Sequence, residues 1–202
     1  MYKKIIKEKL GLLIVLLLIA ISFTINNNAY AFFDNNTSSS SVSNIQIGTW
    51  RDGTPGLEYT LSNGEYQVSL GTAGEEEVII IPEFHQGQPV TSVTEGMFED
   101  NTNVREVIFF ANIAGLGSQE FRNATALEVV TFTYEIEDLG NQVFRGTSSF
   151  VSLYLEGNEN IVPSTHNLTF RDSGLQDVYV PSNMVSNFEQ DGSFSDFNII
   201  GL

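Results

Sequence analysis

A repeat of 23 residues runs along the chain from Val90 and constrains the fold more than any other feature of the sequence. Six apolar positions recur at this spacing in three consecutive units, which is the pattern of a chain built from small equivalent modules. The six columns are Val90, Ile113 and Ile136; Val93, Leu116 and Leu139; Phe98, Phe121 and Phe144; Val104, Leu127 and Phe150; Val107, Val130 and Leu153; and Phe109, Phe132 and Leu155.

A fourth unit follows with looser spacing. It is longer by two or three residues, and Ser164 stands where the second apolar column would continue. Terminal repeats are often irregular because they do not have a repeat on both sides. Its apolar residues are Ile161, Phe170, Leu175, Val178 and Val180. We therefore predict about four repeats, within residues 82–181.

A module of this size cannot bury its own apolar face, so neighbouring modules must stack and share one core. Val107 and Phe109 alternate with the period of a β-strand, as do their equivalents, so both side chains lie on one face. We expect one strand per module, paired in parallel with the next, in a mainly β solenoid with an irregular back side. A stack of buried rings should run along that back side, formed by Phe98, Phe121, Phe144 and Phe170.

A β-hairpin is predicted before the repeats. Apolar and polar residues alternate between Leu57 and Leu70, and Asn63-Gly64 interrupts them at the centre. Both turn residues accept positive φ, which a tight two-residue hairpin turn requires. A continuous apolar strand, Val78 to Ile81, follows and ends at Pro82. We assign residues 49–81 to an N-terminal hairpin cap.

A short helix is predicted after the last repeat. Ser182 can cap its first turn, Met184, Val185 and Phe188 have helical spacing, and Asp191-Gly192 ends the segment. We place the helix at residues 183–190, within a C-terminal cap of residues 182–202. Such a cap would cover apolar surface that otherwise invites association through the open end of the stack.

These features resemble the leucine-rich repeats of the BspA type, which occur in bacterial secreted and surface proteins. The resemblance covers about residues 56–202 and implies a leucine-rich-repeat solenoid with a role in adhesion or host interaction. It rests on Ile81-Pro82, the linker Gln86-Gly87-Gln88-Pro89, the steps Val90-Thr91-Ser92-Val93 and Val104-x-x-Val107, the Phe98 column and Tyr179-Val180-Pro181.

The N-terminus has the layout of a secretory signal peptide. Basic residues precede an uncharged apolar run, Leu10 to Ile25, and Ala29-Tyr30-Ala31 fits a cleavage site. We predict a signal peptide at residues 1–31, cleaved near Ala31, and therefore a secreted or cell-surface protein; an uncleaved membrane anchor is the alternative. Residues 32–48, rich in Asn and Ser, are expected to form a flexible leader.

The charge balance excludes several classes of partner. The chain has 25 acidic and nine basic residues and a formal charge of -16. All four lysines lie in the predicted signal peptide, so the mature chain would carry five arginines, 24 acidic residues and a charge of -19. Nucleic acids and anionic lipid surfaces would be repelled. We predict no nucleic-acid partner and no membrane contact beyond the signal peptide.

The sequence has little material for catalysis or metal binding. Cysteine is absent, and His85 and His166 are the only histidines. The acidic groups at 75–77 and at 135–138 lack the ligand spacing of an EF-hand, so we interpret them as solvated turns, with a weak Ca²⁺ site as the alternative. No nucleophile elbow or phosphate-binding glycine loop occurs, and nothing in the sequence places a histidine beside a serine. We predict no enzyme activity, no catalytic residues, no cofactor and no metal.

Two rows of residues are candidates for binding. If Val107 and Phe109 point inward, the strand residues between them and their equivalents point outward. The candidate strand-face residues are Ile108, Phe110, Thr131, Tyr154 and Tyr179. Exposed aromatic residues on a rigid repeat surface are typical of recognition patches, although strand propensity alone also favours them. The second row follows the phenylalanine column and consists of Arg122, Arg145 and Arg171, which either bind anions or pair with acidic neighbours such as Glu120.

The predicted function is non-catalytic recognition of an extracellular protein or glycan through the strand face. The alternative is a structural, self-associating protein of the cell envelope or matrix. A repeat surface provides area and rigidity and has no chemistry of its own. The sequence does not name the partner and leaves the oligomeric state open.

Overall fold

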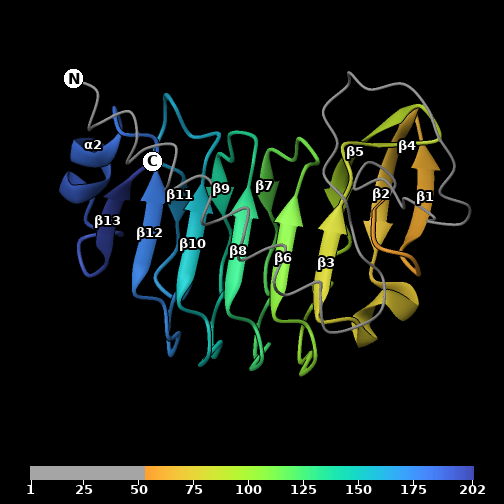
Figure 1. Ribbon diagram of the computed structural model, residues 1–202, viewed down its shortest axis with the longest axis horizontal. Coiled ribbons are helices and arrows are strands. Elements are labelled where there is room, and N and C mark those ends of the chain that lie inside the picture. Colours follow the sequence, from red (N-terminus) through yellow and green to blue (C-terminus); the bar gives the residue numbers. More distant parts are fainter. Residues whose placement is uncertain (1–52) are drawn as a thin grey trace, which may run out of the picture. The chain divides into compact units, whose positions relative to one another are not determined.

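The computed structural model describes residues 53–202, which form a solenoid of parallel β-strands. Its main sheet has six strands, one from each turn of the chain, and they lie side by side in Figure 1. The predicted signal peptide, its cleavage site and the leader lie outside the described residues. The strands are β3 (Val78–Ile81), β6 (Glu106–Phe109), β8 (Val129–Phe132), β10 (Ser152–Leu155), β12 (Asp177–Val180) and β13 (Asn198–Gly201).

The register of the sheet confirms the repeat. Val107 pairs with Val130, and Val130 with Leu153, so positions 23 residues apart are direct neighbours. Both inward columns are almost completely buried, from Val107 and Phe109 to Val178 and Val180. The solenoid fold, with one parallel strand per repeat, is therefore as predicted.

The number of turns is six, and the prediction of about four was too low. β3 starts 28 residues before β6, and β13 starts 21 residues after β12, so neither end has the 23-residue spacing. β3 was assigned to the hairpin cap, yet its Ile79 and Ile81 pair with Val107 and Phe109. β13 lies in the segment assigned to the cap. End turns pack against one neighbour only, so their length is less constrained.

The back side carries a second, smaller parallel sheet. Its strands are β7 (Gly115–Leu116), β9 (Asp138–Leu139) and β11 (Ser164–Thr165), and they lie behind the main sheet in Figure 1. The remaining back side turns without regular structure, as expected. Leu116 and Leu139, in the second apolar column, are buried between the two sheets.

The predicted hairpin is present as β1 (Glu58–Ser62) and β2 (Glu65–Ser69), which pair antiparallel. Asn63 and Gly64 have φ of 54° and 85°, as the turn requires. A 3₁₀ helix, η1 (Gly71–Glu75), leads to β3. The hairpin continues into a four-stranded sheet with β5 (Gln88–Val93) and β4 (Phe84–His85).

One part of the first repeat was placed in the wrong element. Val90 and Val93 belong to β5, which pairs in parallel with β2 and not with the back sheet of the solenoid. The segment described as a linker is a second tight hairpin, with φ of 48° at Gln86 and 81° at Gly87. The first repeat therefore joins the hairpin module to the solenoid.

Aromatic rings stack through the core from turn to turn. The centroids of Phe98 and Phe121 are 4.7 Å apart, those of Phe121 and Phe144 5.3 Å, and those of Phe144 and Phe170 5.7 Å. The predicted phenylalanine column is therefore confirmed, with Phe170 only partly buried at its end. Phe109 and Phe132 form a second stack at 4.7 Å.

The C-terminal helix is α2 (Val185–Gln190), two residues shorter than predicted at its start. Ser182 does not cap it, because its hydroxyl hydrogen-bonds to the carbonyl of Leu202. Met184 occupies the N-cap position without a side-chain cap. Phe188 of the helix and Phe194 after it are fully buried at the end of the core, so the segment does cover the end of the stack.

A buried carboxyl interrupts the core. Glu120 is 2% exposed and stands where the neighbouring turns have Met97 and Val143. Its Oε1 accepts the N–H of Gly117 at 3.0 Å, while Oε2 has no partner in the described part of the chain. Burial, with a smaller contribution from Glu95, raises the pKa of Glu120 to about 7, although backbone hydrogen bonds lower it.

The first prediction concerns the ring stack. We expect Phe121→Ala to lower the free energy of unfolding by about 3–5 kcal/mol, because it leaves a cavity between two stacked rings. Phe84→Ala is the matched control, since Phe84 is 49% exposed, and should cost under about 1 kcal/mol. Denaturant titration measures both values. Equal losses in the two variants would contradict the role given to the stack.

The second prediction concerns Glu120. Its pKa is higher in the folded state than in the unfolded chain, so the native state is penalised increasingly as pH rises from about 4.5 through about 7. We expect Glu120→Gln to raise the free energy of unfolding at about pH 8, by on the order of 2–3 kcal/mol, and to change it little at about pH 4. Denaturant titrations across pH test this. Parallel pH curves for Glu120→Gln and the unchanged protein would refute it.

Candidate binding surface

The outward face of the six-stranded sheet carries one nearly continuous apolar column. Strand pairing brings its members side by side, one from each turn. We call this set the strand-face column: Ile80, Ile108, Thr131, Tyr154, Tyr179 and Ile200. Four of the five predicted strand-face residues therefore lie in one row. The fifth, Phe110, follows β6 and lies one position beyond the row.

The strand-face column is less exposed than predicted. Ile108 is only 8% exposed and counts as buried, which corrects its place in an exposed strip. Thr131, Tyr154, Tyr179 and Phe110 are half-buried. The accessible part of the column is therefore centred on the two tyrosines of β10 and β12.

Tyr154 and Tyr179 form a stacked pair. Their ring centroids are 4.2 Å apart and their planes differ by 4°. Each ring turns one face to the other, so the pair presents ring edges and hydroxyl groups outward. Burial is the largest cause that raises the pKa of Tyr154, followed by Tyr179 and the negative charges of Glu106 and Asp177. Tyr154 therefore remains a neutral phenol at any physiological pH.

Carboxyl groups flank the tyrosine pair. Glu106 and Asp177 occupy the outward column at the amino-terminal ends of β6 and β12, and Asp177 accepts a hydrogen bond from Asn198 Nδ2 at 2.9 Å. Burial, with the charge of Glu128, raises the pKa of Glu106. Glu156 follows β10 on the other side of the column. It reaches solvent, but the surrounding protein atoms desolvate its carboxyl enough to raise its pKa.

The three arginines of the second row do occupy equivalent places in successive turns. Backbone hydrogen bonds of 2.8 and 2.9 Å join these turns, from Asn123 N–H to Arg145 O and from Gly146 N–H to Arg171 O. The guanidinium groups, however, have separate partners within the protein. Arg122 pairs with Glu99, not with Glu120, Arg145 bonds to Gln142 at 2.8 Å, and Arg171 lies 3.6 Å from Asp172. They do not form a row of free cations.

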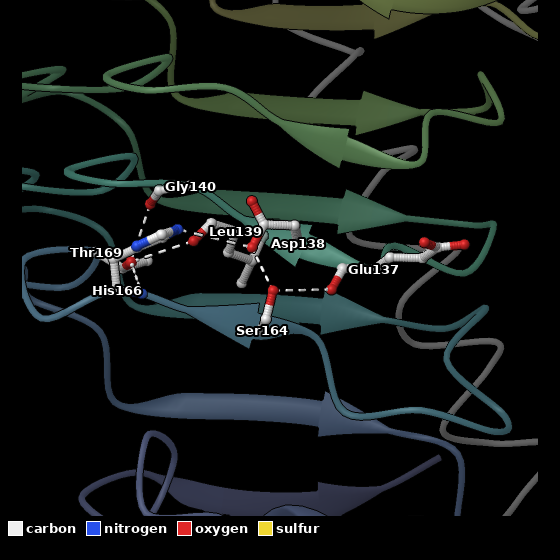
Figure 2. A network of polar contacts seen from close by, with 7 residues as sticks. All are labelled: Glu137, Asp138, Leu139, Gly140, Ser164, His166 and Thr169. Atoms are coloured by element: carbon white, nitrogen blue, oxygen red, sulfur yellow. Dashed lines mark hydrogen bonds and ion pairs between the residues drawn. The ribbon is translucent and has the colours of Figure 1, made fainter.

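The back side brings together a serine, an aspartate and a histidine that sequence reasoning did not connect. Figure 2 shows the hydroxyl of Ser164 donating to Asp138 Oδ1, while His166 Nε2 lies 3.8 Å from the same oxygen. Thr169 fixes the loop by donating to the carbonyls of Leu139 and Gly140 and accepting from the N–H of His166. A signal was present, because Ser164 and His166 are two residues apart and Ser164 extends the Leu116 and Leu139 column.

This constellation does not have the order that nucleophilic catalysis needs. A serine nucleophile must hydrogen-bond to its histidine base, which the carboxylate orients from the other side. Here the carboxylate of Asp138 lies between Ser164 and His166, and Ser164 is engaged with it. Over residues 53–202, no three His, Cys, Asp or Glu side chains gather as a metal site would require.

Residues 78–199 match the BspA type Leucine rich repeat region, in six copies. The chain belongs to this family of leucine-rich repeats. The six copies agree with the six strands of the main sheet. Like leucine-rich repeat proteins in general, it is a protein-interaction module by fold, and the family is typically non-catalytic. In the part of the chain that the structure describes, no helix is long and apolar enough to cross a membrane.

Two solved structures are similar to the chain at 15% sequence identity. One is a leucine-rich repeat protein from Bacteroides ovatus, with a TM-score of 0.48 over 74% of this chain and 40% of that protein. The other is a leucine-rich repeat protein of T. pallidum, with a TM-score of 0.49 over 73% of this chain and 81% of that protein. The chain thus spans less than half of the B. ovatus protein. No curated protein matches the sequence.

The third prediction tests the environment of Tyr154. Because burial disfavours its phenolate, the folded protein and its Tyr154→Phe variant should release the same number of phenol protons up to about pH 11. In denaturant the unchanged protein should release one more. Ultraviolet titration of phenolate counts them, with circular dichroism to confirm that the fold persists. An additional phenol titrating in the folded protein near pH 10 would contradict the burial of Tyr154.

Proposed function

We propose that this protein is a non-catalytic, extracellular recognition module that binds a partner protein or glycan through its strand face. The observation that carries the proposal is the strand-face column, which the register assembles from six separate turns. A contiguous apolar surface on a rigid scaffold loses little conformational entropy on binding and so favours recognition. The family, one of bacterial surface and secreted proteins, supports an extracellular role such as adhesion or host interaction.

The tyrosine pair favours a protein partner over a glycan. Sugars commonly bind with an apolar face against an exposed aromatic ring. The faces of Tyr154 and Tyr179 that meet are 4.2 Å apart and parallel, so they are not available to a sugar. Ring edges with hydroxyl groups suit the mixed apolar and hydrogen-bonding contacts of protein interfaces, where tyrosine is enriched.

Self-association through the ends remains the alternative function, and the two ends differ. At the first strand, Thr54 occupies the outer edge, because its N–H bonds to the carbonyl of Ile80 at 3.1 Å and its hydroxyl accepts from the N–H of Ile80 at 2.7 Å. β13 forms the opposite edge of the sheet. An occupied edge cannot pair with β13 of another copy, so head-to-tail assembly by strand pairing is disfavoured.

The fourth prediction tests the strand face. A fragment of residues 32–202 should capture an extracellular partner saturably in pull-downs against extracellular proteins and glycans. Tyr154→Ala with Tyr179→Ala should weaken that binding at least about tenfold, because aromatic anchors dominate such interfaces. Leu61→Ala with Phe84→Ala is the matched control, since it removes two large apolar side chains that are 54% and 49% exposed on the hairpin module.

Each result separates the candidate functions. Loss of binding in the tyrosine variant alone supports the strand face as the binding surface. Binding that survives the tyrosine change but not the control change would move the surface to the hairpin module and overturn the proposal. Concentration-dependent assembly in analytical ultracentrifugation, unaffected by the tyrosine change, would instead favour the structural alternative.

A further inference from the structure

The strand face has an uncompensated negative charge. Its three carboxyl groups are Glu106, Glu156 and Asp177, which flank the tyrosine pair. The six strands themselves contain no lysine, arginine or histidine. Asp177 has one neutral hydrogen-bond partner, Asn198. The face therefore combines an apolar centre with acidic sides.

The cations of the described chain are engaged elsewhere. Lysine does not occur in residues 53–202, and the arginines there number four. Arg105 is nearest in sequence to the face, but its Nη2 donates to Glu128 Oε1 at 2.5 Å and not to Glu106. The other three pair with Glu99, Gln142 and Asp172 on the row described above. The protein does not neutralise its own strand face within the described residues.

Two of the carboxyl groups are held in surroundings that disfavour their charge. Burial raises the pKa of both Glu106 and Glu156, and for Glu106 the charge of Glu128 adds to it. A positive charge placed beside them would relieve this unfavourable environment and lower both pKa values. Charge complementarity thus points to a cationic occupant, and the half-buried tyrosines and Ile108 point to one that also has apolar parts.

We propose that the strand face binds an extended, arginine- or lysine-bearing segment of a partner protein. Its aliphatic parts lie along the strand-face column, and its cations face Glu106, Glu156 and Asp177. Long basic side chains suit this arrangement because their stems cover apolar surface while their heads reach a carboxylate. The column crosses six strands, about 24 Å at ~4.8 Å per strand spacing, which an extended peptide of about seven or eight residues spans. This inference rests on the proposed function of the strand face.

The fifth prediction uses a synthetic probe. The probe is a labelled peptide of about eight residues that alternates arginine with leucine, and fluorescence anisotropy measures its binding to the full chain. We expect saturable binding that weakens with added salt, and no binding of the peptide with glutamate in place of arginine. The variant Glu106→Gln, Glu156→Gln, Asp177→Asn should bind at least about tenfold more weakly, since it removes three charge pairs and little volume.

A matched variant distinguishes a site from bulk charge. Glu76→Gln, Glu159→Gln, Asp196→Asn removes the same charge from three exposed positions outside the six strands. It should bind the arginine peptide as the unchanged protein does. Equal weakening in both triple variants would show that only net charge attracts the peptide and would overturn the proposal.

A second measurement does not depend on affinity. Carboxyl carbon NMR of the full chain should show the pKa values of Glu106 and Glu156 shifting downward when the peptide is bound. Unchanged values would overturn the proposal even if the peptide binds. The same experiments would identify the chain's own basic segment as the occupant, and so overturn the proposal, if replacing Lys3, Lys4, Lys7 and Lys9 by Gln markedly strengthened peptide binding.

Failure of this proposal differs from failure of the proposed function. If the tyrosine variant loses its captured partner while the neutralised variant keeps it, the face binds a partner that is not basic, and only this inference falls. If neither variant changes capture, the strand face is not the binding surface, and both fall.

Discussion

The distance between neighbouring parallel strands is the constraint on which the rest of this structure depends. Ring centroids in both phenylalanine stacks lie 4.7 Å apart at their closest pairs, close to the ~4.8 Å between hydrogen-bonded strands. A side chain in one turn therefore packs directly on its equivalent in the next. Every turn must supply a residue to every column, so the central turns keep one length. The end turns pack on one side only and depart from it.

The same register organises the outer surface, although no core selects its residues. Outward positions are free to vary, and Glu106, Val129, Ser152 and Asp177 differ completely within one column. The neighbouring column nonetheless stays apolar or aromatic in all but one of its six turns. Residues 23 to 28 positions apart thus become one surface because the strands pair in step. The recognition function rests on this conversion of a sequence period into a spatial patch.

Polar groups serve the corners of the solenoid, where the chain must turn in each repeat. Asp100, Asn123, Gly146 and Asp172 stand at equivalent corners, all with φ between 57° and 76°, a conformation that Asp, Asn and Gly tolerate best. Buried Asn158 completes the backbone of its turn by donating to the carbonyls of Ile136 and Ile161 and accepting from the N–H of Ile136. Glu120 is the exception, since one of its oxygens is unsatisfied, and its burial makes stability depend on pH.

The sequence by itself determined the repeat, the parallel strands, the ring stack and the first hairpin, because each depends on local periodicity or on a two-residue turn. It also placed Tyr154 and Tyr179 in one outward row, since alternation along a strand decides which side chains share a face. Only the tertiary structure decided that the stack has six turns, that Val90 and Val93 join the hairpin sheet, and that Ile108 is nearly buried. It alone brought Ser164 and His166 to Asp138, and paired Arg122 with Glu99. These outcomes depend on which segments pack side by side, and contacts between distant segments leave no period in the sequence.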